Sequence, residues 1–144
     1  MGKKRTVKKA GGGFQHELKA RSLSKLIKRK IAAGSVHITA SFNNTSMVLS
    51  DKDGNALAWS SSGALGFKGA KKGTPFAAAK VGEVIGEKAT LAGIREVDVN
   101  MKGVGQGRES AIRSFASKGI DISSIKDRTP VPFGGTRPRK ARRV

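Results

Sequence analysis

The sequence predicts a single α/β domain in which helices pack on a mixed five-stranded sheet, with basic, extended tails at both ends. The 144 residues supply the core of one domain. Five short strand-like runs occupy the middle of the chain. Turns join the first three runs and a helical pattern joins the last two, which predicts a three-strand antiparallel meander followed by two parallel strands.

The meander starts with a strand over Val36–Phe42, where apolar and polar side chains alternate. On this pattern every second residue, Phe42 included, lies on the buried face of the sheet. Asn43 and Asn44 then turn the chain into a second strand at 47–49.

The third strand, at 56–59, follows an Asp-Gly hairpin signal at 53–54. A long loop of small residues, 60–73, comes next and contains three lysines. We expect its aromatic residue, Phe67, to be exposed. The loop lacks the glycine and lysine spacing of a nucleotide-binding P-loop.

The first helix begins at Thr74, which can cap it, and Pro75, whose backbone suits the first helical position. Apolar residues then recur at helical spacing as far as Gly93, a natural helix stop. The fourth strand covers 96–101.

A glycine loop follows this strand and carries Gly103, Gly105 and Gly107 between two cations, Lys102 and Arg108. Glycines let a backbone approach closely, and the free N–H groups at a helix start favour anions. The loop is therefore a candidate anion-binding turn, and a plain tight turn is the alternative.

The second helix begins near Arg108 and ends at Gly119, and the last strand runs from Ile120 towards Lys126. Short joints between strand, helix and strand are typical of a crossover between parallel neighbours.

The charge is concentrated at the two ends of the chain. There are 29 Lys and Arg against 10 Asp and Glu, for a net charge of +19. Residues 1–30 carry +10 and residues 136–144 carry +5, so the rest carries only +4. Such tails favour a polyanionic partner.

We divide the chain into a basic N-terminal extension (1–34), an α/β RNA-binding domain (35–128) and a Pro/Arg-rich C-terminal tail (129–144). A short basic helix over Ser22–Ile31 is expected to form on a partner, because it offers little apolar surface to bury. Prolines keep the C-terminal tail extended.

Catalytic and cofactor chemistry finds no support in the sequence. There is no cysteine, no membrane-length apolar run and no cofactor or small-molecule motif. Glu96 and Asp98 share a strand face, but the first strand offers Thr39 and Ser41 where a metal site needs a carboxylate. We therefore expect a binding protein and no enzyme.

The basic clusters favour RNA recognised through its backbone. Aromatic residues make up only 5% of the chain, which argues against a platform for stacking single-stranded bases. Folded RNA suits the pattern better.

Five ordered motifs resemble the bacterial-type family of small-subunit ribosomal protein eleven. They are residues 42–45, 54–59, 74–78, 102–113 and 127–132. The similarity runs from about Val36 to Val144. The chain departs from the family at Phe133-Gly134-Gly135, where His-Asn-Gly is common.

The resemblance implies a ribonuclease-H-like topology without catalysis, in a protein of the cytoplasmic ribosome. It implies a place on the platform of the small subunit, bound to 16S-type rRNA. Small-subunit proteins six and eighteen would lie beside it, protein seven would lie across the mRNA exit path, and the C-terminal end would lie near the rRNA that pairs with the mRNA leader.

Charge and resemblance together give seventeen candidate RNA-binding residues. They are Asn43, Asn44, Lys68, Lys71, Lys72, Lys102, Gly103, Gly105, Gly107, Arg108, Arg113, Arg128, Arg137, Arg139, Lys140, Arg142 and Arg143. A nuclease, or a free nucleic-acid-binding module built on the same sheet, is the alternative function.

Overall fold

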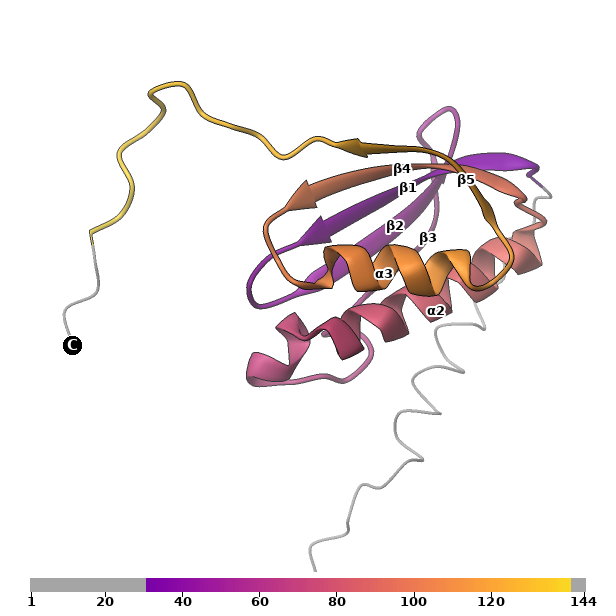
Figure 1. Ribbon diagram of the computed structural model, residues 1–144, viewed down its shortest axis with the longest axis horizontal. Coiled ribbons are helices and arrows are strands. Elements are labelled where there is room, and N and C mark those ends of the chain that lie inside the picture. Colours follow the sequence, from indigo (N-terminus) through magenta and orange to yellow (C-terminus); the bar gives the residue numbers. More distant parts are fainter. Residues whose placement is uncertain (1–30, 141–144) are drawn as a thin grey trace, which may run out of the picture.

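The computed structural model describes residues 31–140, and a five-stranded mixed sheet forms its centre, with strand order β3-β2-β1-β4-β5 (Figure 1). The strands are β1 (Ala33–Ala40), β2 (Thr45–Asp51), β3 (Ala56–Ser61), β4 (Glu96–Gly103) and β5 (Asp121–Asp127). β1, β2 and β3 pair antiparallel, whereas β4 pairs parallel with both β1 and β5. The predicted fold class is confirmed.

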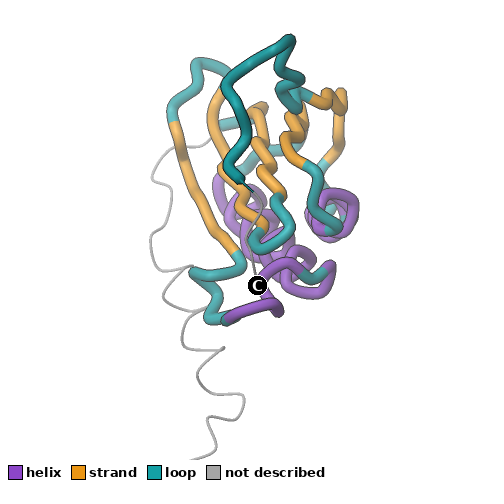
Figure 2. Tube along the Cα trace, turned by 90° about the vertical axis from the view of Figure 1, so that its left-hand side faces the viewer, coloured by secondary structure: helices purple, strands orange, loops and turns teal. Residues whose placement is uncertain are grey.

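Both α-helices lie on the same face of the sheet (Figures 1 and 2). They are α2 (Pro75–Ala92) and α3 (Gly107–Ala116), and a short 3-10 helix, η1 (Gly69–Gly73), precedes α2. The predicted start of α2 is confirmed, because the Thr74 hydroxyl accepts a hydrogen bond from the Ala77 N–H at 3.3 Å. Its predicted stop is also confirmed, since Gly93 is left-handed with φ of 81°. No helix within residues 31–140 has the length and apolarity that a membrane span requires.

The hydrophobic core fills the space between the sheet and the helices. Its largest fully buried side chains come from β1, β2, α2, β4 and α3: Val36, Ile38, Met47, Leu49, Val81, Ile85, Val97, Val99 and Phe115. The period-two and helical patterns of the sequence therefore identified the core faces of β1, α2, β4 and α3.

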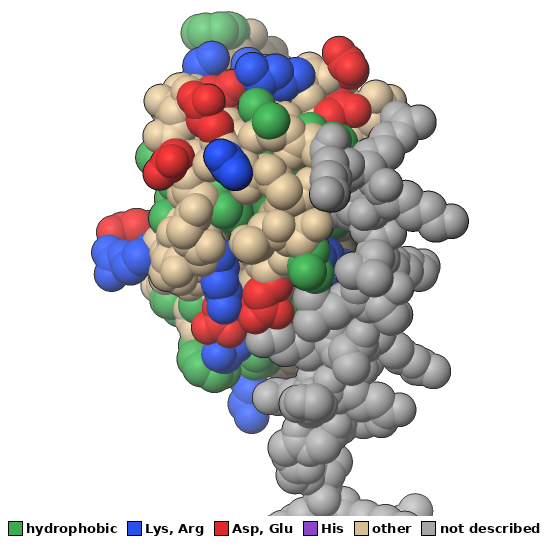
Figure 3. Space-filling model, turned by 90° about the vertical axis from the view of Figure 1, so that its right-hand side faces the viewer, with side chains coloured by type: hydrophobic (Ala, Val, Ile, Leu, Met, Phe, Trp, Pro, Cys, Tyr) green, Lys and Arg blue, Asp and Glu red, His purple; other side chains and the backbone are tan. Residues whose placement is uncertain are grey.

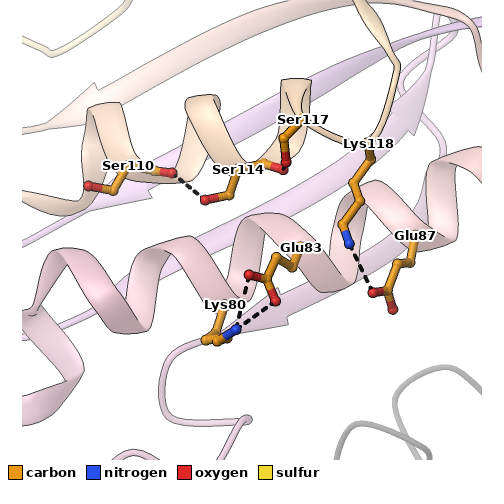
Figure 4. Close-up of polar contacts among 7 residues, drawn as sticks. All are labelled: Lys80, Glu83, Glu87, Ser110, Ser114, Ser117 and Lys118. Carbon is orange, nitrogen blue, oxygen red and sulfur yellow. Dashed lines mark hydrogen bonds and ion pairs between the residues drawn. The ribbon is translucent and has the colours of Figure 1, made fainter.

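The two helices pack closely because α2 presents glycines to α3. A Cβ atom on Gly82 would lie 2.5 Å from the Ala111 carbonyl oxygen, and one on Gly86 would lie 2.6 Å from Cγ of Lys118. An ion pair between Lys118 and Glu87, at 3.2 Å, joins the same two segments (Figure 4). The position of α3 is thus fixed against α2.

Two details differ from the sequence prediction. β1 ends at Ala40, so Phe42 lies in the following turn and its side chain is 77% exposed instead of buried. Phe67 is half-buried and packs against the core, because the loop around it folds back onto β3. The expected helix over Ser22–Ile31 falls almost wholly outside the described residues.

Candidate nucleic-acid interface

Three loops meet at one end of the sheet, and we call residues 41–44, 62–74 and 103–106 the loop end (Figure 2). They meet because β1 and β4 are parallel and finish at the same edge, where β2 begins. Backbone hydrogen bonds tie them together: Gly105 N donates to Ala40 O at 3.3 Å, and Ser62 N donates to Thr45 O at 2.9 Å. The fold therefore gathers residues that are far apart in the sequence.

The loop after β1 is a tight, well-braced turn. Ser41 N donates to Asn44 O at 2.8 Å, and the Ser41 hydroxyl accepts a hydrogen bond from Asn44 N at 3.1 Å. Gly73 packs directly against the turn, since a Cβ at this position would lie 2.1 Å from the Phe42 carbonyl oxygen. Phe42 and Asn43 are consequently held at the exposed tip.

The loop of residues 62–74, which we call the lysine loop, lies beside this turn. Cδ of Lys72 and Oδ1 of Asn44 both approach Gly63, at 3.8 and 3.9 Å from the position of a Cβ on that glycine. Lys68 and Lys71 are exposed and Lys72 is half-buried. Among the described residues none of these three lysines forms an ion pair with a carboxylate. Their charges thus remain available to a partner.

The glycine loop is packed more tightly than its sequence suggests. A Cβ on Gly103 would lie 1.9 Å from Ala40 O, and one on Gly105 would lie 2.3 Å from Ser41 O. Gly103 N donates to the Thr129 hydroxyl at 3.0 Å, so this N–H and that of Gly105 have partners within the protein. These glycines build the loop end, and the predicted anion-binding role stays a prediction that now rests on the amino end of α3.

Arg108, at the start of α3, forms an ion pair with Asp127 at the end of β5. The Asp127 carboxylate also accepts hydrogen bonds from Thr129 N, at 2.9 Å, and from the Thr129 hydroxyl, at 2.6 Å. These Thr129 hydrogen bonds, and the Arg108 guanidinium after them, lower the pKa of Asp127 to about 2. With the Gly103 hydrogen bond they form a network, which we call the tail clamp (Gly103, Arg108, Asp127 and Thr129).

The other predicted residues are dispersed. Lys102 lies on the sheet face opposite the helices, because its neighbour Met101 packs towards the core. Arg113 pairs with Glu109 at 2.8 Å and lines a groove of about 580 Å³ between α3 and β5. Arg128 and five tail residues complete the set. Arg128, Arg137, Arg139 and Lys140 are exposed, while Arg142 and Arg143 lie outside the described residues.

The opposite end of the sheet carries four acidic residues. Asp51 and Asp53 lie at the β2–β3 turn, and Glu96 and Asp121 begin β4 and β5. Figure 3 looks onto this side, where acidic and basic side chains are intermixed. Within the part of the chain that is described, no cluster of His, Cys, Asp or Glu has three members placed to hold a metal ion.

Sequence reasoning missed two features of this interface, the exposed ring of Phe42 and the tail clamp. Alternation along β1 concealed the first, since Phe42 continues the apolar pattern past the end of the strand. The second joins residues 26 positions apart and had no local signal beyond the Asp-x-Thr-Pro motif.

Comparison with known proteins gives one consistent result. The family model described as Ribosomal protein S11 matches residues 34–143. The chain is 54% identical over 125 residues to small ribosomal subunit protein uS11 of Leptothrix cholodnii. The aligned residues cover 87% of this chain and 93% of the relative. The uS11 proteins of Variovorax paradoxus (50% over 125 residues, 87% and 93% covered) and Solibacter usitatus (49% over 126 residues, 88% and 93% covered) are similar to nearly the same extent.

Proposed function

Because the chain belongs to the ribosomal protein S11 family, we propose that it binds small-subunit rRNA through the loop end and its basic tails. Membership makes it a structural component of the small ribosomal subunit, in the cytoplasmic ribosome, with a role in translation.

The uniform charge of the loop end carries the argument. Residues 41–44, 62–74 and 103–106 contain three lysines and no acid. The amino ends of α2 and α3 lie at the same end and add partial positive charge. An RNA backbone complements such a surface, and counterion release on binding makes the affinity depend on salt.

The proposed position of the domain within the small subunit is taken from the resemblance to the family. We propose that the domain lies on the platform, next to small-subunit proteins six and eighteen and with protein seven across the mRNA exit path. The C-terminal tail, with Arg137, Arg139 and Lys140 exposed, would then reach the rRNA near that path. The proposed role is assembly and shaping of this region, without catalysis.

The salt dependence of rRNA binding tests the surface. We expect Lys68→Ala, Lys71→Ala and Lys72→Ala each to reduce the slope of log K against log salt by about one, because each removes one phosphate contact. Lys52→Ala is the matched control, since Lys52 lies at the opposite end of the sheet. An unchanged slope in the triple variant would remove the lysine loop from the interface.

A further inference from the structure

Two aromatic rings, one in the loop end and one in the adjoining first turn of α2, are exposed to solvent. The side chain of Phe42 is 77% exposed, and that of Phe76, in the first turn of α2, is 63% exposed. A ring of this size gains free energy when it is buried, so two exposed rings at one end of a small domain indicate a contact surface.

The Phe42 ring is presented by a rigid turn. Ser41 and Asn44 close this turn with backbone and hydroxyl hydrogen bonds, and Gly73 packs against its carbonyl side. Within residues 31–140 this ring has no aromatic or cation–π partner. The backbone of the turn is therefore preorganised, and it offers the ring to a flat partner that the domain does not supply.

The Phe76 ring is supported from two sides. Phe67 meets it in a T-shaped contact with ring centroids 6.1 Å apart, and Nζ of Lys80 lies 5.7 Å from its centroid. Glu83 holds that ammonium group in place at 2.9 Å. These contacts fix the ring and still leave most of it exposed.

The surrounding charge decides which kind of partner fits. No acid occurs in the three loops. Lys71 and Lys72 directly precede Gly73, which packs against the Phe42 carbonyl, and Lys72 and Asn44 both approach Gly63. A polyanion satisfies the lysines, but a continuous RNA duplex hides the faces of its bases. RNA with an unstacked base offers both a flat face for the rings and phosphates for the lysines.

We propose that the loop end holds an unpaired nucleotide of RNA, with its base stacked on Phe42. The side-chain amide of Asn43, at the tip of the same turn, faces the edge of that base. Lys71 and Lys72 contact the flanking phosphates, and Phe76 offers a second ring to a neighbouring base. This inference rests on the proposed function only in taking RNA as the partner.

The test compares two RNA hairpins. One is fully paired, and the other is identical except for one additional bulged purine, for which a fluorescent analogue is used. We expect the full-length protein to bind the bulged hairpin roughly 5- to 150-fold more tightly than the fully paired one, which is the range for stacking one base. Fluorescence of the analogue should be quenched on binding.

Variants identify the ring that is responsible. Phe42→Ala should abolish the preference for the bulge, and Phe42→Trp should keep it, because tryptophan also stacks. Leu91→Ala is the control, since Leu91 is 60% exposed near the far end of α2. Circular dichroism of each variant establishes that the domain is folded, which we expect for substitutions at exposed positions.

Three results would overturn the inference. Equal wild-type affinity for both hairpins, with normal salt dependence, would remove the stacking site and leave the proposed function intact. Absence of salt-dependent binding to either hairpin would remove both. If Phe42→Ala kept the preference for the bulge but reduced entry into subunits when other ribosomal proteins were present, the ring would fit a protein partner instead.

Discussion

At the scale of single residues, Asp127 determines how the C-terminal tail leaves the domain. Its carboxylate accepts hydrogen bonds from Thr129 and pairs with Arg108, and these contacts keep its pKa near 2, below the ordinary value of 3.8. A depressed pKa means that the ionised carboxylate stabilises the folded state. That stabilisation is present above pH 3.8 and is lost as the pH falls through about 2.

Asp127→Asn should therefore lower the free energy of unfolding near neutral pH. The deficit relative to the wild type should shrink as the pH falls from about 4 towards 2, where the wild-type carboxyl is itself protonated. Urea unfolding at a series of pH values measures the difference. A deficit that stayed constant over this interval would show that the Asp127 charge makes no contribution.

Thr129→Val should release the amide of Gly103, because the valine side chain offers no acceptor. We expect faster hydrogen exchange at this amide and a loss of roughly 0.5–1.5 kcal/mol in the free energy of unfolding. Thr129→Ser keeps the hydroxyl and serves as the control. Equal exchange in all three proteins would argue against the tail clamp.

The residue scale is also where sequence prediction reached its limit. Alternation predicted a buried Phe42, yet β1 ends two residues before it. Low aromatic content argued against a platform for stacking single-stranded bases, but composition does not say which rings the fold leaves exposed. Three-dimensional contacts, and not local pattern, determine both properties.

At the scale of elements, the sequence predicted nearly all of the architecture. The Thr74-Pro75 start and the Gly93 stop of α2 have local chemical causes, so they were predictable. The pairing of β1 with β4 was not, since residues 33–40 and 96–103 are distant in the chain and no turn specifies their register. This pairing is what brings the three loops together.

The contact between the helices provides a test in which two effects have opposite signs. Gly82→Ala raises helix propensity by about 1 kcal/mol, but the new methyl group meets the Ala111 carbonyl. We expect steric overlap to win and to destabilise the domain by about 1–3 kcal/mol, measured by thermal or urea unfolding. Stabilisation by about 1 kcal/mol would mean that α3 can move away without cost.

At the scale of the whole molecule, charge is distributed unevenly in two ways. The tails hold most of the excess positive charge, and within the domain the loop end has lysines without acids while the opposite end mixes both signs (Figure 3). The first asymmetry could be read from the sequence. The second required the strand order, because it depends on which loops share an edge.

Deleting residues 136–144 should reduce the salt slope of rRNA binding more than any single substitution. The segment carries five basic residues, so full engagement with phosphates predicts a decrease of roughly four to five. Stability of the domain should be unaffected, because these residues form no helix or strand up to position 140. A slope equal to that of the full chain would show that the tail does not touch phosphate.

Co-sedimentation tests the central claim most directly. Tagged full-length protein is expressed in a bacterial host, and lysates at moderate and at high salt are resolved on sucrose gradients. We predict that the protein migrates with small subunits and their precursors at moderate salt, and that Lys68→Ala, Lys71→Ala and Lys72→Ala combined with deletion of 136–144 shifts it towards the top of the gradient. Wild-type protein that remained at the top of the gradient at moderate salt would contradict the assignment to the small subunit.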